Sequence, residues 1–265
     1  MNTIADYTKG YSNGKSKKIT PFELAQMRCD WYNETPGSLK YINCDKCKNK
    51  GYVAGLDENQ NETRFECSCM NKRKSIMNLE RSGLGSLIRR YTFKAYETSE
   101  AWQLDVKKKA MVFAEESGNS WFYAAGQSGS GKTHICTAIC TRLIADGHVV
   151  KYKIWRELFH ELQSTQFDDS GYKNKINELC NTDVLYIDDF LKTNSNNSKI
   201  GDELNFAFEI INKRYNANKK TIISTELLIS DIQKYDSALA GRIAERAAGF
   251  IIQIKKDGSK NYRMR

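Results

Sequence analysis

The chain has 265 residues, a formal net charge of +9 and a hydrophobic content of 40%, which allows one full α/β domain and a smaller module. It contains no apolar run of about 18 residues, so no transmembrane helix is expected. Its polar N-terminus also lacks the hydrophobic segment of a signal peptide. These absences predict a cytoplasmic protein without membrane contact.

In a reducing cytoplasm, the eight cysteines are expected to be metal ligands or buried small residues instead of disulfides. The positive charge favours a polyanionic partner such as nucleic acid. A merely basic protein would have the same charge balance, so the charge alone does not decide between the two.

The N-terminal part of the chain changes character near Thr20. Residues 1–18 are rich in Lys, Ser, Asn and Gly, and we expect them to be disordered. A helix is predicted to begin after Thr20, which is placed to cap it together with Glu23, and to end near Asn33. Its apolar face would carry Phe22, Leu24, Met27 and Trp31. That face is suited either to packing on the next module or to docking on a partner.

Four cysteines lie close together in the sequence, at Cys44, Cys47, Cys67 and Cys69. A Cys-x-x-Cys turn places two thiolates on one side, and Cys-x-Cys in an extended segment does the same. Between them we expect a hairpin with strands near 51–53 and 63–65. The spacing favours a structural zinc site whose metal stabilises a module too small for its own core. A redox Cys-x-x-Cys pair and four unrelated thiols are the alternatives.

Residues 70–100 are predicted to be a connector with helical residues over 72–84, and an amphipathic helix is predicted over 102–116.

An apolar strand at 121–125 then leads into GQSGSGKT, residues 126–133, and a helix over 134–144 follows. Strand, glycine loop and helix in this order predict a phosphate site, because backbone N–H groups and the helix N-terminus converge on the anion. Lys132 would reach the β- and γ-phosphates, and Thr133 would hold Mg²⁺. The predicted nucleotide-binding residues are Gly126, Ser128, Gly129, Ser130, Gly131, Lys132, Thr133 and His134.

A second motif, VLYIDDF at residues 184–190, predicts a buried parallel strand with two carboxylates at its C-terminal end. Ligands bind at that edge of open α/β sheets. Asp188 would help to hold Mg²⁺, and Asp189 would orient or deprotonate the attacking water. In isolation, a strand ending in an acidic turn would explain the motif equally well, but the upstream glycine loop favours the catalytic interpretation.

Further strands are predicted at 148–154, 219–225 and 251–254, with helices at 155–163, 202–215 and 238–246. The end of the 219–225 strand is the place for a polar γ-phosphate sensor, either Thr225 or Glu226. Arg242 and Arg246 share a helix face. They are either a surface pair bridged to acidic residues, or one of them is an arginine finger that reaches the γ-phosphate of a neighbouring subunit.

These motifs, in this order and spacing, resemble the AAA+ ATPases, and more narrowly the bacterial or phage replicative helicase loaders of the DnaC/DnaI type. The narrower resemblance depends on GQSGSGKTHI, VLYIDDF, FEIINKRYNANKKTIIST and AGRIAERAAGF. It implies a parallel sheet flanked by helices, ATP and Mg²⁺ as ligands, Asp188 and Asp189 as the Walker B pair, Arg246 as the arginine finger and Arg263 as a second-sensor arginine. It also implies binding to a hexameric replicative helicase through the N-terminal region, to single-stranded DNA through the ATPase domain, and self-association.

Two departures from that family pattern affect the expectations. Glu226 follows Ser224 and Thr225 where the family usually has Asn, and a carboxylate cannot donate to phosphate unless it is protonated. The chain also stops at Arg265, which predicts no separate lid domain and weak ATP hydrolysis unless subunits assemble.

The predicted organisation is a tail at 1–18, a helix with a Cys₄ zinc module for partner docking at 19–75, a linker at 76–100 and an ATPase domain at 101–265. Alternative functions are an IstB-like transposition helper that binds duplex DNA, and a regulator that binds nucleotide without turnover.

Overall fold

The computed structural model describes residues 19–81, 85–192 and 200–262. The chain divides into two compact units, Met1–Lys74 and Ser75–Arg265, and each is described by itself. The predicted tail at 1–18 and the predicted second sensor Arg263 lie outside the described residues. Among these residues, no helix has the length and apolar composition that a membrane crossing requires.

The first unit is built from one helix and one hairpin. Helix α2 (Pro21–Glu34) has the predicted capping box: the Thr20 hydroxyl accepts from the Glu23 amide at 3.2 Å, and the Glu23 carboxylate accepts from the Thr20 amide at 2.8 Å. Strands β1 (Tyr52–Leu56) and β2 (Glu62–Glu66) pair antiparallel. The helix face differs from the prediction, because Phe22 is exposed and Cys29 is the buried residue.

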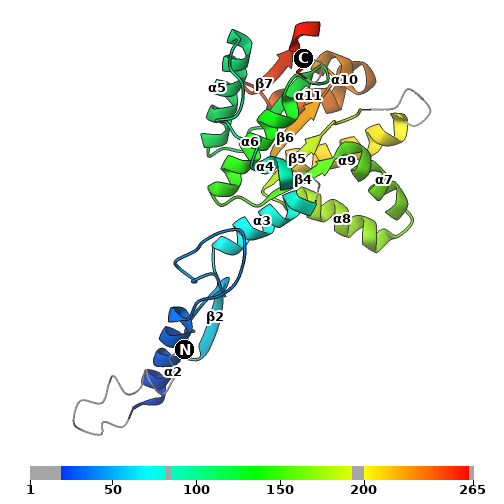
Figure 1. Ribbon diagram of the computed structural model, residues 1–265. Coiled ribbons are helices and arrows are strands. Elements are labelled where there is room, and N and C mark those ends of the chain that lie inside the picture. The colour runs from blue at the N-terminus through cyan, green and yellow to red at the C-terminus, as the bar shows by residue number, and fades with distance from the viewer. Residues whose placement is uncertain (1–18, 82–84, 193–199, 263–265) are drawn as a thin grey trace. The chain divides into compact units, whose positions relative to one another are not determined.

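The second unit alternates helices with strands along the chain (Figure 1). Helix α3 begins in the first unit and ends in the second. The elements are α3 (Cys69–Arg81), α4 (Gly85–Ile88), α5 (Ala101–Glu115), β3 (Phe122–Gly126), α6 (Lys132–Ala145), β4 (Val150–Ile154), α7 (Trp155–Thr165), α8 (Asp169–Asn181), β5 (Val184–Asp188), α9 (Ile200–Asn216), β6 (Lys220–Thr225), α10 (Ile229–Tyr235), α11 (Ser237–Arg246), β7 (Ile251–Ile254) and a 3₁₀ turn (Gly258–Lys260).

Five of these strands form one parallel sheet in the order β4-β5-β6-β3-β7. Because side chains alternate along a strand, Tyr123 and Ala125 of β3 belong to the core on one face, whereas Phe122 and Ala124 belong to the core on the other. Helices α7, α8, α9 and α11 contribute to the first core, and α5 and α6 contribute to the second. The predicted α/β class with a helix-flanked parallel sheet is confirmed.

One helix was not expected from the sequence, and the segment before α5 belongs to the second unit. Helix α10 was not predicted, although Asp231 stabilises its first turn by accepting from the Leu228 amide at 3.0 Å. Residues 75–100, most of which were predicted to be a linker, group with the second unit. They supply part of the wall of the cleft described next.

Candidate functional site

A cleft of about 620 Å³ lies where the carboxyl ends of β3 and β5 and the segment after β6 meet the start of α6. The strands are parallel and adjacent, so their C-terminal residues come together at one edge of the sheet. The cleft contains most of the predicted nucleotide and magnesium residues: Ser128, Gly129, Ser130, Gly131, Lys132, Thr133, His134, Asp188 and Asp189.

The loop from Gly126 to Gly131 has a backbone that only glycine adopts easily at three positions. Gly126, Gly129 and Gly131 have φ values of 148°, 77° and 85°, and positive φ is costly for residues with a Cβ. At Gly126 a Cβ would also lie 2.8 Å from the Cβ of Ile254. Gly131 is the N-cap of α6, so the loop ends at a helix N-terminus, which favours an anion.

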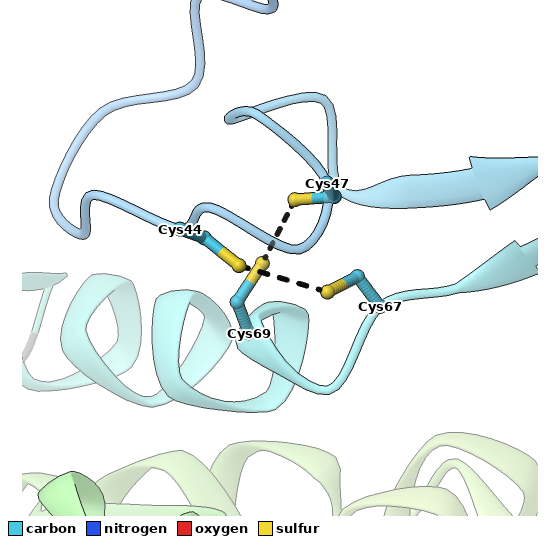
Figure 2. Close-up of side chains that lie close together, drawn as sticks. All are labelled: Cys44, Cys47, Cys67 and Cys69. Atoms are coloured by element: carbon cyan, nitrogen blue, oxygen red, sulfur yellow. Dashed lines mark hydrogen bonds between the residues drawn. The ribbon is translucent and has the colours of Figure 1, made fainter. Parts of the chain in front are cut away.

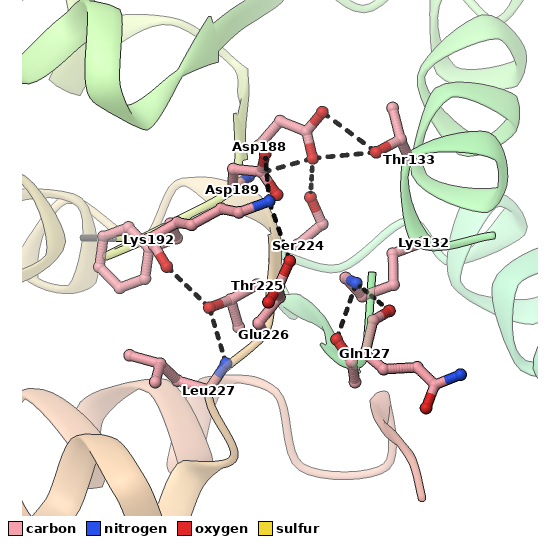
Figure 3. Close-up of polar contacts among 12 residues, drawn as sticks. Gln127, Lys132, Thr133, Asp188, Asp189, Lys192, Ser224, Thr225, Glu226 and Leu227 are labelled. Carbon is pink, nitrogen blue, oxygen red and sulfur yellow. Dashed lines mark hydrogen bonds and ion pairs between the residues drawn. The ribbon is translucent and has the colours of Figure 1, made fainter. Parts of the chain in front are cut away.

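Lys132 is buried at the first turn of α6, with its side chain folded along the loop (Figure 3). Its Nζ donates to the carbonyl oxygens of Gly126 and Gln127, both at 2.8 Å. Burial lowers the pKa of Lys132, and the nearby carboxylates of Glu226, Asp189 and Asp188 oppose that shift. The loop thus holds a poorly solvated ammonium group beside the cleft, where a phosphate would compensate its charge.

Asp188 ends β5 as a buried carboxylate with donors from three neighbouring elements. The Thr133 hydroxyl lies 3.2 and 3.3 Å from its two oxygens, the Tyr152 hydroxyl donates at 3.1 Å, and the Ser224 hydroxyl also donates to it. The predicted pair Thr133 and Asp188 therefore comes together (Figure 3). A hydroxyl and a carboxylate are suitable oxygen ligands for Mg²⁺.

Asp189 begins the turn after β5 and is paired with a lysine. Its φ of 51° is in the left-handed region, and its carboxylate lies 3.3 Å from Nζ of Lys192. The same ammonium lies 2.9 Å from Glu226. All three side chains line the cleft.

The two residues proposed for the γ-phosphate sensor are placed differently. The Thr225 hydroxyl is buried, donates to the Phe190 carbonyl at 2.7 Å and accepts from the Leu227 amide at 3.1 Å. Its proton is thus already used in the turn after β5. Glu226, in contrast, lines the cleft.

Aromatic side chains form the wall of the cleft near α6. His134 stacks on Tyr91 with ring centroids 4.6 Å apart, and it meets Tyr96 edge-on at 5.2 Å. Burial lowers the pKa of His134 and so favours its neutral ring. The buried Tyr96 hydroxyl has no hydrogen-bond partner among the described residues. An aromatic wall of this kind suits a nucleobase.

The four predicted zinc ligands of the first unit also come together (Figure 2). Their sulfur atoms all lie within 4.8 Å of one another, with Cys44 and Cys67 at 3.8 Å and Cys47 and Cys69 at 3.5 Å. A tetrahedral site with Zn–S bonds of about 2.3 Å requires sulfurs about 3.8 Å apart, so the cluster is compatible with zinc. Burial opposes ionisation of Cys47, but the Gly51 amide and the neighbouring thiols outweigh it and lower the pKa of Cys47 to about 6.

Comparison with known proteins identifies the family. Residues 65–264 match the family model described as IstB-like ATP binding protein. The chain belongs to this family. It is therefore an ATP-binding P-loop ATPase, and the resemblance to the DnaC-like AAA+ proteins is confirmed at the level of the family.

Individual relatives of this IstB-like chain share only moderate sequence identity with it. It is 30% identical over 222 residues to the phage-like element PBSX protein XkdC of Bacillus subtilis, covering 80% of this chain and 82% of that protein. It is 28% identical over 171 residues to the replicative helicase loader DnaC of Escherichia coli, covering 63% of this chain and 66% of that protein. A solved structure of DnaI has the same fold, with a TM-score of 0.51, 22% identity, and coverage of 67% of this chain and 93% of that one.

The predicted arginine finger of this IstB-like ATPase lies on α11, and it is not among the residues that line the cleft of its own chain. The Arg246 guanidinium donates to the Asn119 carbonyl at 3.0 Å and to the side chain of Asn218. Arg242 lies over the ring of Phe208, 4.9 Å from its centroid. A finger would act on a neighbouring subunit, so this placement leaves the prediction for Arg246 untested.

Several residues in or next to the cleft of this family member were missed by reading the sequence. Tyr152 and Ser224 donate to Asp188, and Lys192 bridges two carboxylates. Ser224 could have been found from the sequence. It precedes Thr225 at a strand end, and adjacent residues face opposite sides of a strand, so Ser224 is the candidate on the side that Thr225 does not face. The contribution of Tyr152 could be found only from the strand order.

Proposed function

We propose that this chain loads a replicative DNA helicase onto single-stranded DNA, with ATP binding and hydrolysis as the switch. The observation that carries the proposal is the combination of a Walker-type cleft in one unit with a four-cysteine cluster in another. An ATPase unit suits a timed change of state, and a separate small module suits docking on a protein partner. The 28% identity to a replicative helicase loader supports this choice.

The residues of the cleft have separate roles in the proposed reaction. Backbone N–H groups of the glycine loop and the Lys132 ammonium bind the β- and γ-phosphates, and Thr133 and Asp188 hold Mg²⁺. When bound, Mg²⁺ neutralises charge on the phosphate oxygens. Asp189 orients the attacking water, and Tyr91 and Tyr96 receive the nucleobase.

The proposed role of the first unit is to dock on the helicase. Zinc bound by the four cysteines would hold α3 and the hairpin together, because so small a unit buries little apolar surface. The proposed docking module is residues 19–75, and the proposed ATPase domain is residues 101–265.

The ATPase domain is proposed to act in an assembly. Arg246 would complete the cleft of a neighbouring subunit as its arginine finger, and arginine fingers raise turnover by about three orders of magnitude or more. Hydrolysis by an isolated subunit is therefore expected to be weak, and turnover per molecule is expected to rise with protein concentration.

A loading assay tests this function. Single-stranded DNA circles are incubated with a hexameric replicative helicase, ATP and the protein, and the helicase retained on DNA is measured. The expected result is retention that requires the protein and is lost with Lys132→Ala, whereas Lys234→Ala on the exposed side of α10 behaves as the wild type. Absence of both a helicase complex and retention would contradict the proposal.

A transposition helper is the second candidate function, because the matching family model is described as IstB-like. Duplex DNA would then be the preferred ligand. Binding of labelled single-stranded and duplex DNA of equal length at one salt concentration separates the two candidates, since both depend on phosphate contacts and hence on salt. The third alternative, a regulator without turnover, is disfavoured because both Asp188 and Asp189 line the cleft.

A further inference from the structure

Lys192 lies in the cleft without a role in the functions described above. It follows a tight turn in which Asp189 and Leu191 have φ values of 51° and 53°. The turn is fixed by buried contacts, since the Phe190 amide donates to the Ser224 carbonyl at 2.9 Å and the Phe190 and Leu191 side chains are buried. Left-handed non-glycine residues are costly, and they cluster at functional sites. This backbone holds the Lys192 ammonium beside two carboxylates of the cleft.

The carboxylates of the cleft make a second lysine important for binding a triphosphate. Three carboxylates, those of Asp188, Asp189 and Glu226, line the cleft together with the ammonium groups of Lys132 and Lys192. A triphosphate adds further negative charge, and like charges at short range are unfavourable. Glu226 would therefore repel the γ-phosphate unless a cation lay between them.

Lys192 supplies a cation beside Glu226 (Figure 3). Its Nζ lies 2.9 Å from Glu226 Oε1 and 3.3 Å from Asp189 Oδ2. The hydrogen bond to Glu226 is the main reason that the pKa of Lys192 is raised, so the group stays an ammonium at neutral pH. All three side chains remain partly exposed, between 37% and 42%, so the ion pairs are open to exchange with a ligand.

We propose that Lys192 reads the terminal phosphate of ATP by exchanging its ion pairs with Asp189 and Glu226 for a contact with the γ-phosphate. With a diphosphate bound, the ammonium stays on the two carboxylates. With a triphosphate bound, it moves to the phosphate and leaves Asp189 free to face the attacking water. Glu226 stands where the family usually has a neutral Asn as sensor. Lys192 and Glu226 together thus take the place of that side chain. The inference depends on the proposed binding of ATP in this cleft.

The test compares the affinity of the full-length protein for ADP and for a non-hydrolysable ATP analogue, both with Mg²⁺. Lys192→Met removes the charge, Lys192→Arg keeps it, and Glu226→Gln removes one of the two carboxylates that pair with it. Lys234→Met is the matched control, because Lys234 makes a similar pair, 3.2 Å from Asp231 three residues earlier, on α10. Lys132→Ala reports whether nucleotide binds in this cleft at all.

Lys192→Met is expected to lose about tenfold or more in affinity for the analogue, as for loss of a hydrogen bond between charged groups, with a much smaller loss for ADP. Lys192→Arg should restore most of the preference for the analogue. Glu226→Gln should increase that preference, because the ammonium then has to leave one carboxylate, that of Asp189, instead of two. Lys234→Met should match the wild type.

Two different failures can be told apart. Equal ratios of analogue to ADP affinity in Lys192→Met and Lys234→Met, while Lys132→Ala weakens both nucleotides, would overturn the role of Lys192 and leave the ATP site intact. If the wild type bound neither nucleotide, or if Lys132→Ala changed nothing, the proposed ATP site would be wrong and this inference with it.

Discussion

At the scale of single residues, Asp188 combines burial with a charge. Its carboxylate accepts from the hydroxyls of Thr133, Tyr152 and Ser224 and from the Asp189 amide, so these neighbouring donors are all directed at its oxygens. A carboxylate next to a hydroxyl offers the oxygen ligands that a magnesium ion takes in proteins.

Replacing Asp188 by Asn keeps the volume and removes the charge. We expect at least a tenfold loss of affinity for an ATP analogue in Mg²⁺, because metal-site changes cost about that much, and no such loss when EDTA has removed the metal. Titration with a fluorescent analogue measures both. Asp146→Asn, at the exposed end of α6, should behave as the wild type. An equal loss with and without Mg²⁺ would argue against a metal role for Asp188.

His134 gives a prediction about pH. Burial lowers the pKa of its ring, so the unfolded chain binds that proton more readily than the folded protein does. The free energy of unfolding should therefore be unaffected by this group well above the ordinary histidine pKa of about 6.5, and should fall as pH drops below it. Urea unfolding between about pH 8 and pH 5.5 measures this, and His134→Gln should have a flatter pH profile. Identical profiles would contradict the assignment.

Sequence reading worked for some of these residues and failed for others for a physical reason. Lys132, Thr133 and Asp188 belong to motifs whose spacing along the chain predicts that they meet at one site, and the structure brings them to one cleft. Tyr152 and Lys192 belong to no motif, and they reach the cleft because β4 lies beside β5 and because a turn directs the chain after Phe190. Strand order and turn conformation are tertiary properties that a single sequence does not display.

At the scale of elements, Arg214 connects α9 to its neighbours. The side chain is fully buried, and it donates to the Leu179 carbonyl at 2.6 Å, the Thr182 carbonyl at 3.1 Å and the Thr221 hydroxyl at 3.0 Å. Burial lowers the pKa of Arg214 to about 10, so it remains charged at neutral pH. One side chain thus satisfies polar groups at the end of α8 and the start of β6.

Arg214→Met fills a similar volume but leaves those acceptors without a donor. We expect the free energy of unfolding to fall by about 3 kcal/mol, the size associated with breaking a buried polar network. Chemical denaturation measures it, with Arg156→Met on the exposed face of α7 as control. A loss as small as that of the control would show that water replaces the guanidinium without cost.

Most elements could be predicted because their apolar periodicity is strong, as in the strand before Gly126 and the helix after it. Helix α10 was missed because it has seven residues, too few for periodicity to be visible. The segment before α5 is predicted as a linker, and Tyr91 and Tyr96 from it line the cleft. The sequence carries no motif that indicates their place there.

At the scale of the whole molecule, the two units should differ in how they are stabilised. The second unit has a large core on both faces of its sheet, whereas the buried residues that form the core cluster of the first unit are Cys47, Cys67 and Cys69. If zinc binds the cluster, the stability of the first unit depends on the metal.

Cys67→Ser is therefore expected to reduce bound zinc from about one ion per chain to near zero, and to make the first unit sensitive to proteolysis while the second keeps ATP binding. Elemental analysis and limited proteolysis measure the two effects. Cys29→Ala, a buried cysteine of the same unit outside the cluster, should keep its zinc. Full resistance to proteolysis in the zinc-free variant would contradict the metal-dependent fold.

The measurement that tests the central claim most directly is an experimental structure with Mg²⁺ and a non-hydrolysable ATP analogue. We predict the β- and γ-phosphates on the glycine loop within hydrogen-bond distance of the Lys132 ammonium, and the metal between Thr133 and Asp188. An analogue bound elsewhere, or Lys132 and Asp188 on opposite sides of a cleft without nucleotide, would contradict the account.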